Sequence, residues 1–155
     1  MPNLITHNYF AKDVLKKIRK DIIDSFIEKQ NIYELFAQSF DPFFTYEVLP
    51  FHEKLGYFLH DNHIDTFFIS YIRIMKEEKL ENFPSILAAL YGHLTHYVLD
   101  SICHPYVLYK AGEYNELKPE TFKYVGKHTQ MECEIDAYFY ETRENKKFKD
   151  CKRSN

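Results

Sequence analysis

The chain has 155 residues, of which 28% are charged and 45% hydrophobic, and its formal net charge is −3. At roughly 100–200 residues per domain this length predicts one domain, and 14 phenylalanines with 13 tyrosines exclude a disordered chain. The small negative charge excludes a protein that binds nucleic acid through bulk electrostatics. Only four glycines argue against many short strands, so we expect an all-α, single compact multi-helix domain at residues 1–144 and a polar tail at 145–155.

No apolar run approaches the roughly 20 residues that a membrane-spanning helix needs. The N-terminal segment MPNLITHNYFAKDVLKKIRKD contains no continuous apolar core, so we expect no signal peptide. Three cysteines at irregular spacing do not predict a disulfide framework. A cytoplasmic location is therefore the expectation.

Apolar residues at steps of three and four predict a first helix at residues 8–28, with Phe10, Val14 and Ile18 on one face. A second helix is expected at 31–40, because the residue before Pro42 disfavours the helical region. We expect an aromatic loop and then further helices in chain order: the loop at 41–50, and helices at 52–60, 65–78, 83–103 (ending before Pro105) and 119–144.

The strongest local pattern is the run His96, Asp100 and His104, in which each residue lies four positions after the previous one. On a helix this spacing places the three side chains on one face. Apolar neighbours such as Leu94 and Val98 predict that the helix is buried. A buried aspartate needs a compensating partner, and a cation is one such partner.

A second pattern of the same kind contains His128 and Glu132, with Asp136 four positions further on. Imidazole nitrogens and carboxylate oxygens bind zinc at about 2.0–2.2 Å, and we expect Asp136 to support a ligand histidine as a hydrogen-bond acceptor. Each pattern alone could also be a buried histidine bonded to a neighbour, or a solvated pair on a helix. Two such stripes in one chain favour a metal site. His52, His63 and His93 receive no assignment and could equally be surface residues, and His93 could also pack or contact a ligand residue from behind.

The segment LYGHLTHYVLDSICHPYV (residues 90–107) resembles the pattern G-F-x-x-H-x-x-x-D-x-x-x-H-P-Y of the bacterial zinc-dependent phospholipase C family. Further segments fall in the same order as in that family, from the first helix to the last: THNYFAKDVL at 6–15, SFDPFF at 39–44, GYFLH at 56–60 and HTQMECEID at 128–136. The chain departs from the family at His93, where an aromatic or apolar residue is usual, and at Ser39 and Phe40, where Gly and Pro are usual.

The resemblance implies an all-helical fold, shared with fungal single-strand nucleases, that holds two to three zinc ions. It also implies the ligands of each ion: Asp41, His60, His96 and Asp100 for one zinc; His104, His128 and Glu132 for a second; and His7, with Asp100 as a bridge, for a third. Asp41 corresponds to a residue beside the attacking water, so Asp41 is the expected general base.

The expected activity is that of a zinc-dependent phosphodiesterase acting on a small phosphoester or a phospholipid headgroup. Clustered metals suit this reaction because they activate water and neutralise the phosphoryl oxygens. Two alternatives stay open. The adjacent pair His60 and Asp61 also fits the His-Asp domain metal phosphohydrolases, and a helical module could bind metal without catalysis.

Overall fold

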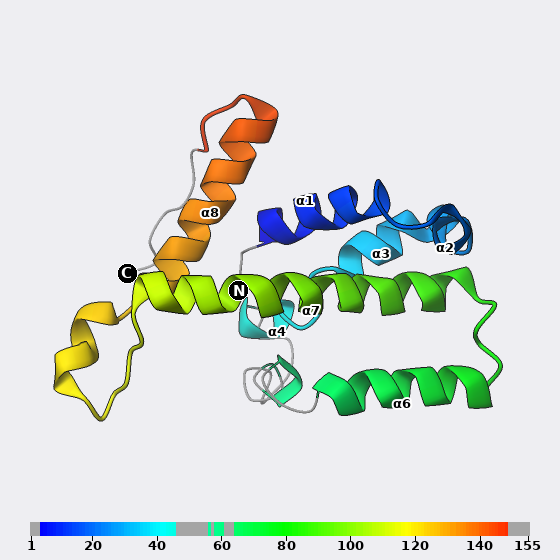
Figure 1. The fold of residues 1–155 in the computed structure, drawn as a ribbon, viewed down its shortest axis with the longest axis horizontal. Coiled ribbons are helices and arrows are strands. Elements are labelled where there is room, and N and C mark those ends of the chain that lie inside the picture. Colours follow the sequence, from blue (N-terminus) through cyan, green and yellow to red (C-terminus); the bar gives the residue numbers. More distant parts are fainter. Residues whose placement is uncertain (1–3, 46–55, 57, 61–63, 149–155) are drawn as a thin grey trace. The chain divides into compact units, whose positions relative to one another are not determined.

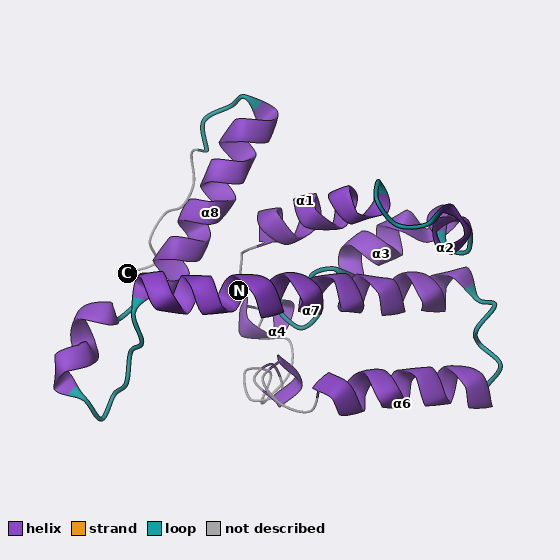
Figure 2. Cartoon of the chain, in the orientation of Figure 1, coloured by secondary structure: helices purple, strands orange, loops and turns teal. Residues whose placement is uncertain are grey.

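The computed structural model describes residues 4–45, 56, 58–60 and 64–148 (Figure 1). Helices account for most of these residues, and none of them lies in a β-strand (Figure 2). The all-α prediction is therefore confirmed. Of the segments predicted from the sequence, most of the expected helix at 52–60 lies outside the described residues.

The helices of the described residues follow one another along the chain as Figure 1 colours them. Their bounds are α1 (Leu4–Leu15), α2 (Lys20–Asp24), the 3-10 helix η1 (Ile27–Lys29), α3 (Gln30–Phe36), α4 (Pro42–Thr45), α6 (Ile64–Glu77), α7 (Pro84–Ala111), η2 (Pro119–Tyr124) and α8 (Lys127–Glu144).

The chain divides into two compact units. The middle unit is Ala11–His96, and the terminal unit combines Met1–Phe10 with Tyr97–Asn155. Both boundaries fall inside helices, one in α1 and one in α7, so each of these two helices contributes to both units.

Aromatic rings and alanines form the core of the middle unit. Phe26 and Tyr33 are buried with ring centroids 5.5 Å apart, and Phe26 stacks on Tyr91 at 5.2 Å. The Tyr33 hydroxyl donates to the carbonyl of Ala11 and lies 3.1 Å from the hydroxyl of Thr95, so its polar end is satisfied inside the core. These contacts join α1, α3 and α7.

Gly92 allows α7 to lie unusually close to α3. A Cβ atom at this position would lie 2.6 Å from the carbonyl oxygen of Tyr33 and 2.8 Å from the Cβ of Phe36. Backbone cannot yield cheaply to such a contact, so the absence of a side chain at Gly92 sets the spacing of the two helices. The last turn of α3, and the turn that follows it, are thereby held beside α7.

The single helix predicted at residues 8–28 is wrong, because the chain breaks between α1 and α2. The N–H of Lys16 donates to a carbonyl only three residues back, and Arg19 is extended, with φ −59° and ψ 143°. Four of the five residues at 16–20 are Lys or Arg, and like charges at this spacing disfavour a helix. The break also turns Phe26 into the core.

Three other predicted boundaries are wrong. Helix α7 continues through Pro105, although proline removes a backbone hydrogen bond, because Val107 and Ala111 bury apolar surface beyond it. The helix predicted at 119–144 is divided at Gly126, whose positive φ of 69° interrupts the helical path. The loop predicted at 41–50 is helical in its first part, since α4 begins at Pro42, whose fixed φ suits a first helical position.

Substitution of Gly92 by alanine is expected to destabilise the protein by about 1–3 kcal/mol, as overpacking does. In an ordinary helix interior the same change stabilises by roughly 0.5–1 kcal/mol, so the sign of the effect tests the close approach. Chemical denaturation measures it. The matched control is Ser101→Ala at an exposed position of α7, which should change the free energy of unfolding by less than about 0.5 kcal/mol. A stabilised Gly92→Ala variant would contradict the close contact.

Candidate metal centre

Helix α7 buries its polar face and exposes part of its apolar one. His96 and Asp100 are only 4% and 5% exposed, whereas Leu94, Val98 and Ile102 are 41%, 39% and 67% exposed. The predicted burial of the histidine and the aspartate is confirmed, and Leu99 beside them is buried as well. The exposure of the other three shows that the helix is only partly buried. Burial of a carboxylate costs several kcal/mol unless it is compensated. The buried side of α7 therefore carries ionisable side chains, His96 and Asp100, that need a compensating partner.

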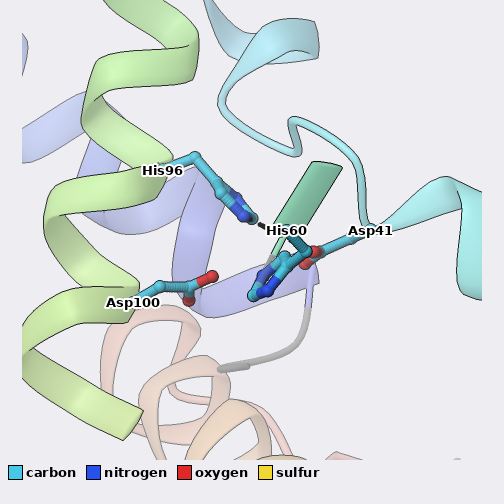
Figure 3. A group of neighbouring side chains, drawn as sticks. All are labelled: Asp41, His60, His96 and Asp100. Carbon is cyan, nitrogen blue, oxygen red and sulfur yellow. Dashed lines mark ion pairs between the residues drawn. The ribbon is translucent and has the colours of Figure 1, made fainter. Parts of the chain in front are cut away.

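Three of the predicted site residues meet in the middle unit (Figure 3). Asp41 lies in the turn between α3 and α4, His60 lies in a short helical stretch, and His96 projects from α7. The Oδ1 atom of Asp41 is 3.5 Å from Nε2 of His96 and 3.8 Å from Nε2 of His60. The three donor atoms all lie within 4.8 Å of one another.

The orientation of His96 is fixed from behind by the backbone. Its Nδ1 atom is 3.1 Å from the carbonyl oxygen of Ala37. A carbonyl oxygen only accepts hydrogen bonds, so Nδ1 carries the hydrogen. In the neutral ring, Nε2 then presents a lone pair toward Asp41, which is how histidines that bind metals are usually oriented.

The separations in this cluster fit a metal better than they fit hydrogen bonds. Nitrogen and oxygen ligands at about 2.0–2.2 Å from a tetrahedral zinc lie about 3.4 Å from each other. The pair Asp41 and His96, at 3.5 Å, matches that edge, and the pair Asp41 and His60, at 3.8 Å, is close to it. Both distances exceed a normal hydrogen bond. The donor set, two imidazoles and a carboxylate, is also one that zinc accepts.

A second group of predicted residues meets in the terminal unit. Donor atoms of His104, His128 and Glu132 lie within 4.8 Å of one another. His104 belongs to α7, and the other two are one turn apart on α8. Nε2 of His128 lies 2.6 Å from a carboxylate oxygen of Glu132, so these two are in hydrogen-bond contact. Burial lowers the pKa of His128, which favours the neutral imidazole that metals bind.

The terminal unit also brings together His7 and Asp100. Nε2 of His7 is 3.2 Å from Oδ1 of Asp100, and both side chains are almost completely buried. His7 comes from the first turns of α1 and Asp100 from α7. The histidine and the aspartate, which are far apart in the sequence, thus form a close pair.

Asp136 does not support a ligand histidine in the described contacts, so that prediction is corrected. Its carboxylate accepts hydrogen bonds from the N–H of Ile5 at 3.1 Å and from the N–H and hydroxyl of Thr6 at 2.9 and 2.5 Å. It therefore satisfies the first backbone N–H groups of α1, which have no partner within the helix. Burial raises the pKa of Asp136, and these hydrogen bonds oppose the rise. Because His7 follows Thr6 directly, Asp136 anchors the turn that carries His7.

One histidine that the sequence analysis set aside is buried beside the cluster of the middle unit. His93 is 6% exposed, and its Nδ1 lies 2.9 Å from the hydroxyl of Ser39. The signal in the sequence was its position three residues before His96, on the same side of α7. The other two histidines set aside, His52 and His63, lie outside the described residues, as does Asp61.

The fold and these groups define an all-helical protein with two candidate metal-binding clusters of histidines and carboxylates. The chain belongs to the zinc dependent phospholipase C family, whose sequence pattern matches residues 6–155. No curated protein and no solved structure matches the chain significantly. Among the described residues, every helix is too short or too polar to cross a membrane.

Replacement of Asp136 by asparagine is expected to lower the free energy of unfolding by about 1–3 kcal/mol. The new amide nitrogen can only donate hydrogen bonds, so a backbone N–H that the carboxylate now satisfies would lose its acceptor. Thr6→Val removes the hydroxyl of the same contact and should also destabilise. Thr6→Ser keeps the hydroxyl and is the matched control. Urea denaturation of the three variants measures the effect. Equal stability of Thr6→Val and Thr6→Ser would show that the hydroxyl contact contributes nothing.

Proposed function

We propose that the protein is a zinc-dependent phosphodiesterase that cleaves phosphodiester bonds in the manner of a phospholipase C. The observation that carries this proposal is the cluster of Asp41, His60 and His96, whose donor atoms are spaced for a tetrahedral ion. Asp41 and His96 are buried, and His60 is partly buried. Membership of a zinc-dependent family supports the choice of zinc over other cations.

The proposed ligands follow from the described groups and from the register of α7. Asp100 lies one turn beyond His96 on the same face of α7 and is the proposed fourth ligand of the first zinc. His104, His128 and Glu132 are the proposed ligands of a second zinc. His7, beside Asp100, is the proposed ligand of a third. Two to three ions are therefore expected.

When bound, zinc supplies a Lewis acid that lowers the pKa of a water to about 7 and neutralises charge on phosphoryl oxygens. The proposed role of Asp41 is to orient that water and to accept its proton as the general base. The backbone carbonyl of Ala37 holds the ring of His96 so that this face of the cluster does not rotate during the reaction. Phosphodiesters of phospholipid headgroups are the proposed substrate class, in line with the family to which the chain belongs.

The two alternatives from the sequence predict different outcomes. A His-Asp domain phosphohydrolase would depend on Asp61 and would leave His104, His128 and Glu132 without a role, although these three converge in the terminal unit. A module that binds metal without catalysis would be stabilised by zinc but would not turn over a phosphodiester. The first alternative is disfavoured by family membership, and the second is decided by experiment.

Asp41→Asn is expected to lower the rate of hydrolysis of a chromogenic phosphodiester by about 10²–10⁴-fold, the range that a general acid or base contributes. The test uses protein that is reconstituted with zinc, with metal content measured in parallel. Asp61→Ala is the matched control and should retain activity. Loss of activity in Asp61→Ala, with activity kept in Asp41→Asn, would support the His-Asp alternative instead.

Zinc is expected to stabilise the folded protein because the proposed ligands converge only when the chain is folded. At a free concentration one hundred times its dissociation constant, a single bound zinc raises the free energy of unfolding by about 2.7 kcal/mol. Denaturation with and without a chelator measures the shift. Magnesium, which prefers six oxygen ligands, is the control and should have little effect. Identical unfolding with zinc, with the chelator and with magnesium would argue against a zinc site.

A further inference from the structure

The turn between α3 and α4 contains a residue in a conformation that its type rarely adopts. Ser39 has a φ of 45°, in the left-handed region that glycine enters freely and serine does not. Its N–H donates to the carbonyl of Phe36 at 2.9 Å, so the chain turns sharply after α3. A residue in this region persists only where its surroundings hold it there.

His93 provides that hold from α7. Its Nδ1 lies 2.9 Å from the Ser39 hydroxyl, and both groups belong to the middle unit. The ring is enclosed by aromatic side chains, with centroid distances of 4.9 Å to Phe36, 5.1 Å to Phe40 and 5.2 Å to Phe67. Burial, with a smaller contribution from His96, lowers the pKa of His93 to about 4, so the ring is neutral near pH 7.

The turn is thus attached to α7 at two points. His96 bonds to the carbonyl of Ala37, and His93 bonds to the hydroxyl of Ser39. The two histidines are three residues apart, so they project from the same side of the helix. Asp41 is only two residues beyond Ser39, and its N–H donates to the carbonyl of Gln38 at 3.1 Å within the same turn. The direction of the chain at Ser39 therefore determines where Asp41 lies.

We propose that Ser39 and His93 are positioning residues that hold the Asp41 carboxylate against His96. This inference rests on the proposed function, because it assigns the purpose of the pair to the site that contains Asp41. Ser39 and His93 act through the backbone of the turn, and neither is proposed as a zinc ligand.

Four variants separate the hydrogen bond from the backbone conformation. Ser39→Ala removes the hydroxyl and keeps a Cβ in the left-handed region. Ser39→Gly removes both the hydroxyl and the conformational penalty. His93→Phe keeps an aromatic ring among its aromatic neighbours and removes Nδ1. The double variant Ser39→Gly/His93→Phe combines the last two changes. Tyr33→Phe, which removes the buried hydrogen bonds of the Tyr33 hydroxyl to Ala11 of α1 and to Thr95 of α7, is the matched control.

Two measurements are made on each variant of the full chain. Zinc affinity is measured by competition with a chromogenic chelator, and hydrogen exchange is measured at the amide of Asp41. We expect Ser39→Ala and His93→Phe to bind zinc about 10–100-fold more weakly, as is typical when a group that orients a metal ligand is removed. Their Asp41 amide should exchange faster than in the wild type. The double variant should recover much of the affinity lost in His93→Phe, because glycine adopts the turn without a hydrogen bond.

The control should lose stability and keep the wild-type zinc affinity. The inference is overturned if Ser39→Ala and His93→Phe behave as Tyr33→Phe does, with lower stability and unchanged affinity and exchange at Asp41. If His93→Phe does not fold, Ser39→Ala against Ser39→Gly gives the same comparison. If the wild type binds no zinc, the proposed function fails, and exchange at Asp41 still decides whether the pair positions this residue.

Discussion

The burial of ionisable groups is the constraint on which the rest of this structure depends. Among the described residues of the terminal unit, the buried polar residues outnumber the buried apolar ones: Thr6, His7, Asp100, Glu132 and Asp136 against Leu99, Val107 and Ala111. Three of these are carboxylates, and each is at most 7% exposed. A helical protein of this size normally fills such positions with leucine or valine. Burial of these polar groups lowers the stability of the folded protein unless they have partners, so we infer that they serve a function.

Backbone groups do much of the work of holding these side chains. The first N–H groups of α1 bind Asp136, and a carbonyl after α3 binds the ring of His96. Backbone partners cannot rotate away as side chains can, so the groups they hold keep one orientation. The close approach at Gly92 has the same effect on a larger scale, because it fixes α3 and the turn after it against α7. The middle unit thus orients its cluster through main-chain geometry.

Local spacing in the sequence predicted the features that are local in the structure. The run His96, Asp100 and His104 lies on one helix as its four-residue steps indicated, and α6 begins and ends within one residue of its predicted bounds. The cluster of His104, His128 and Glu132 also contains only predicted residues.

Features that depend on distant residues could not be predicted in this way. The contact of Ser39 with His93 joins residues 54 positions apart, and that of Thr6 with Asp136 joins residues 130 apart. No periodicity relates such pairs, so His93 was set aside and Asp136 was given the wrong partner. The predicted single domain and the cytoplasmic location stay predictions, as do the roles of the individual zinc ligands.

Helix α7 also determines which changes in chain length this protein can tolerate. Its polar residues recur at intervals of about one turn, and His104 lies eight positions after His96, a rise of about 12 Å. One inserted residue between them would rotate His104 by about 100° and remove it from its group on α8. Substitutions on the exposed side of the same turns, at Leu94, Val98 and Ile102, are expected to change stability little, because those side chains are exposed. The segment from His96 to His104 is therefore expected to accept substitutions on its exposed side but not insertions or deletions.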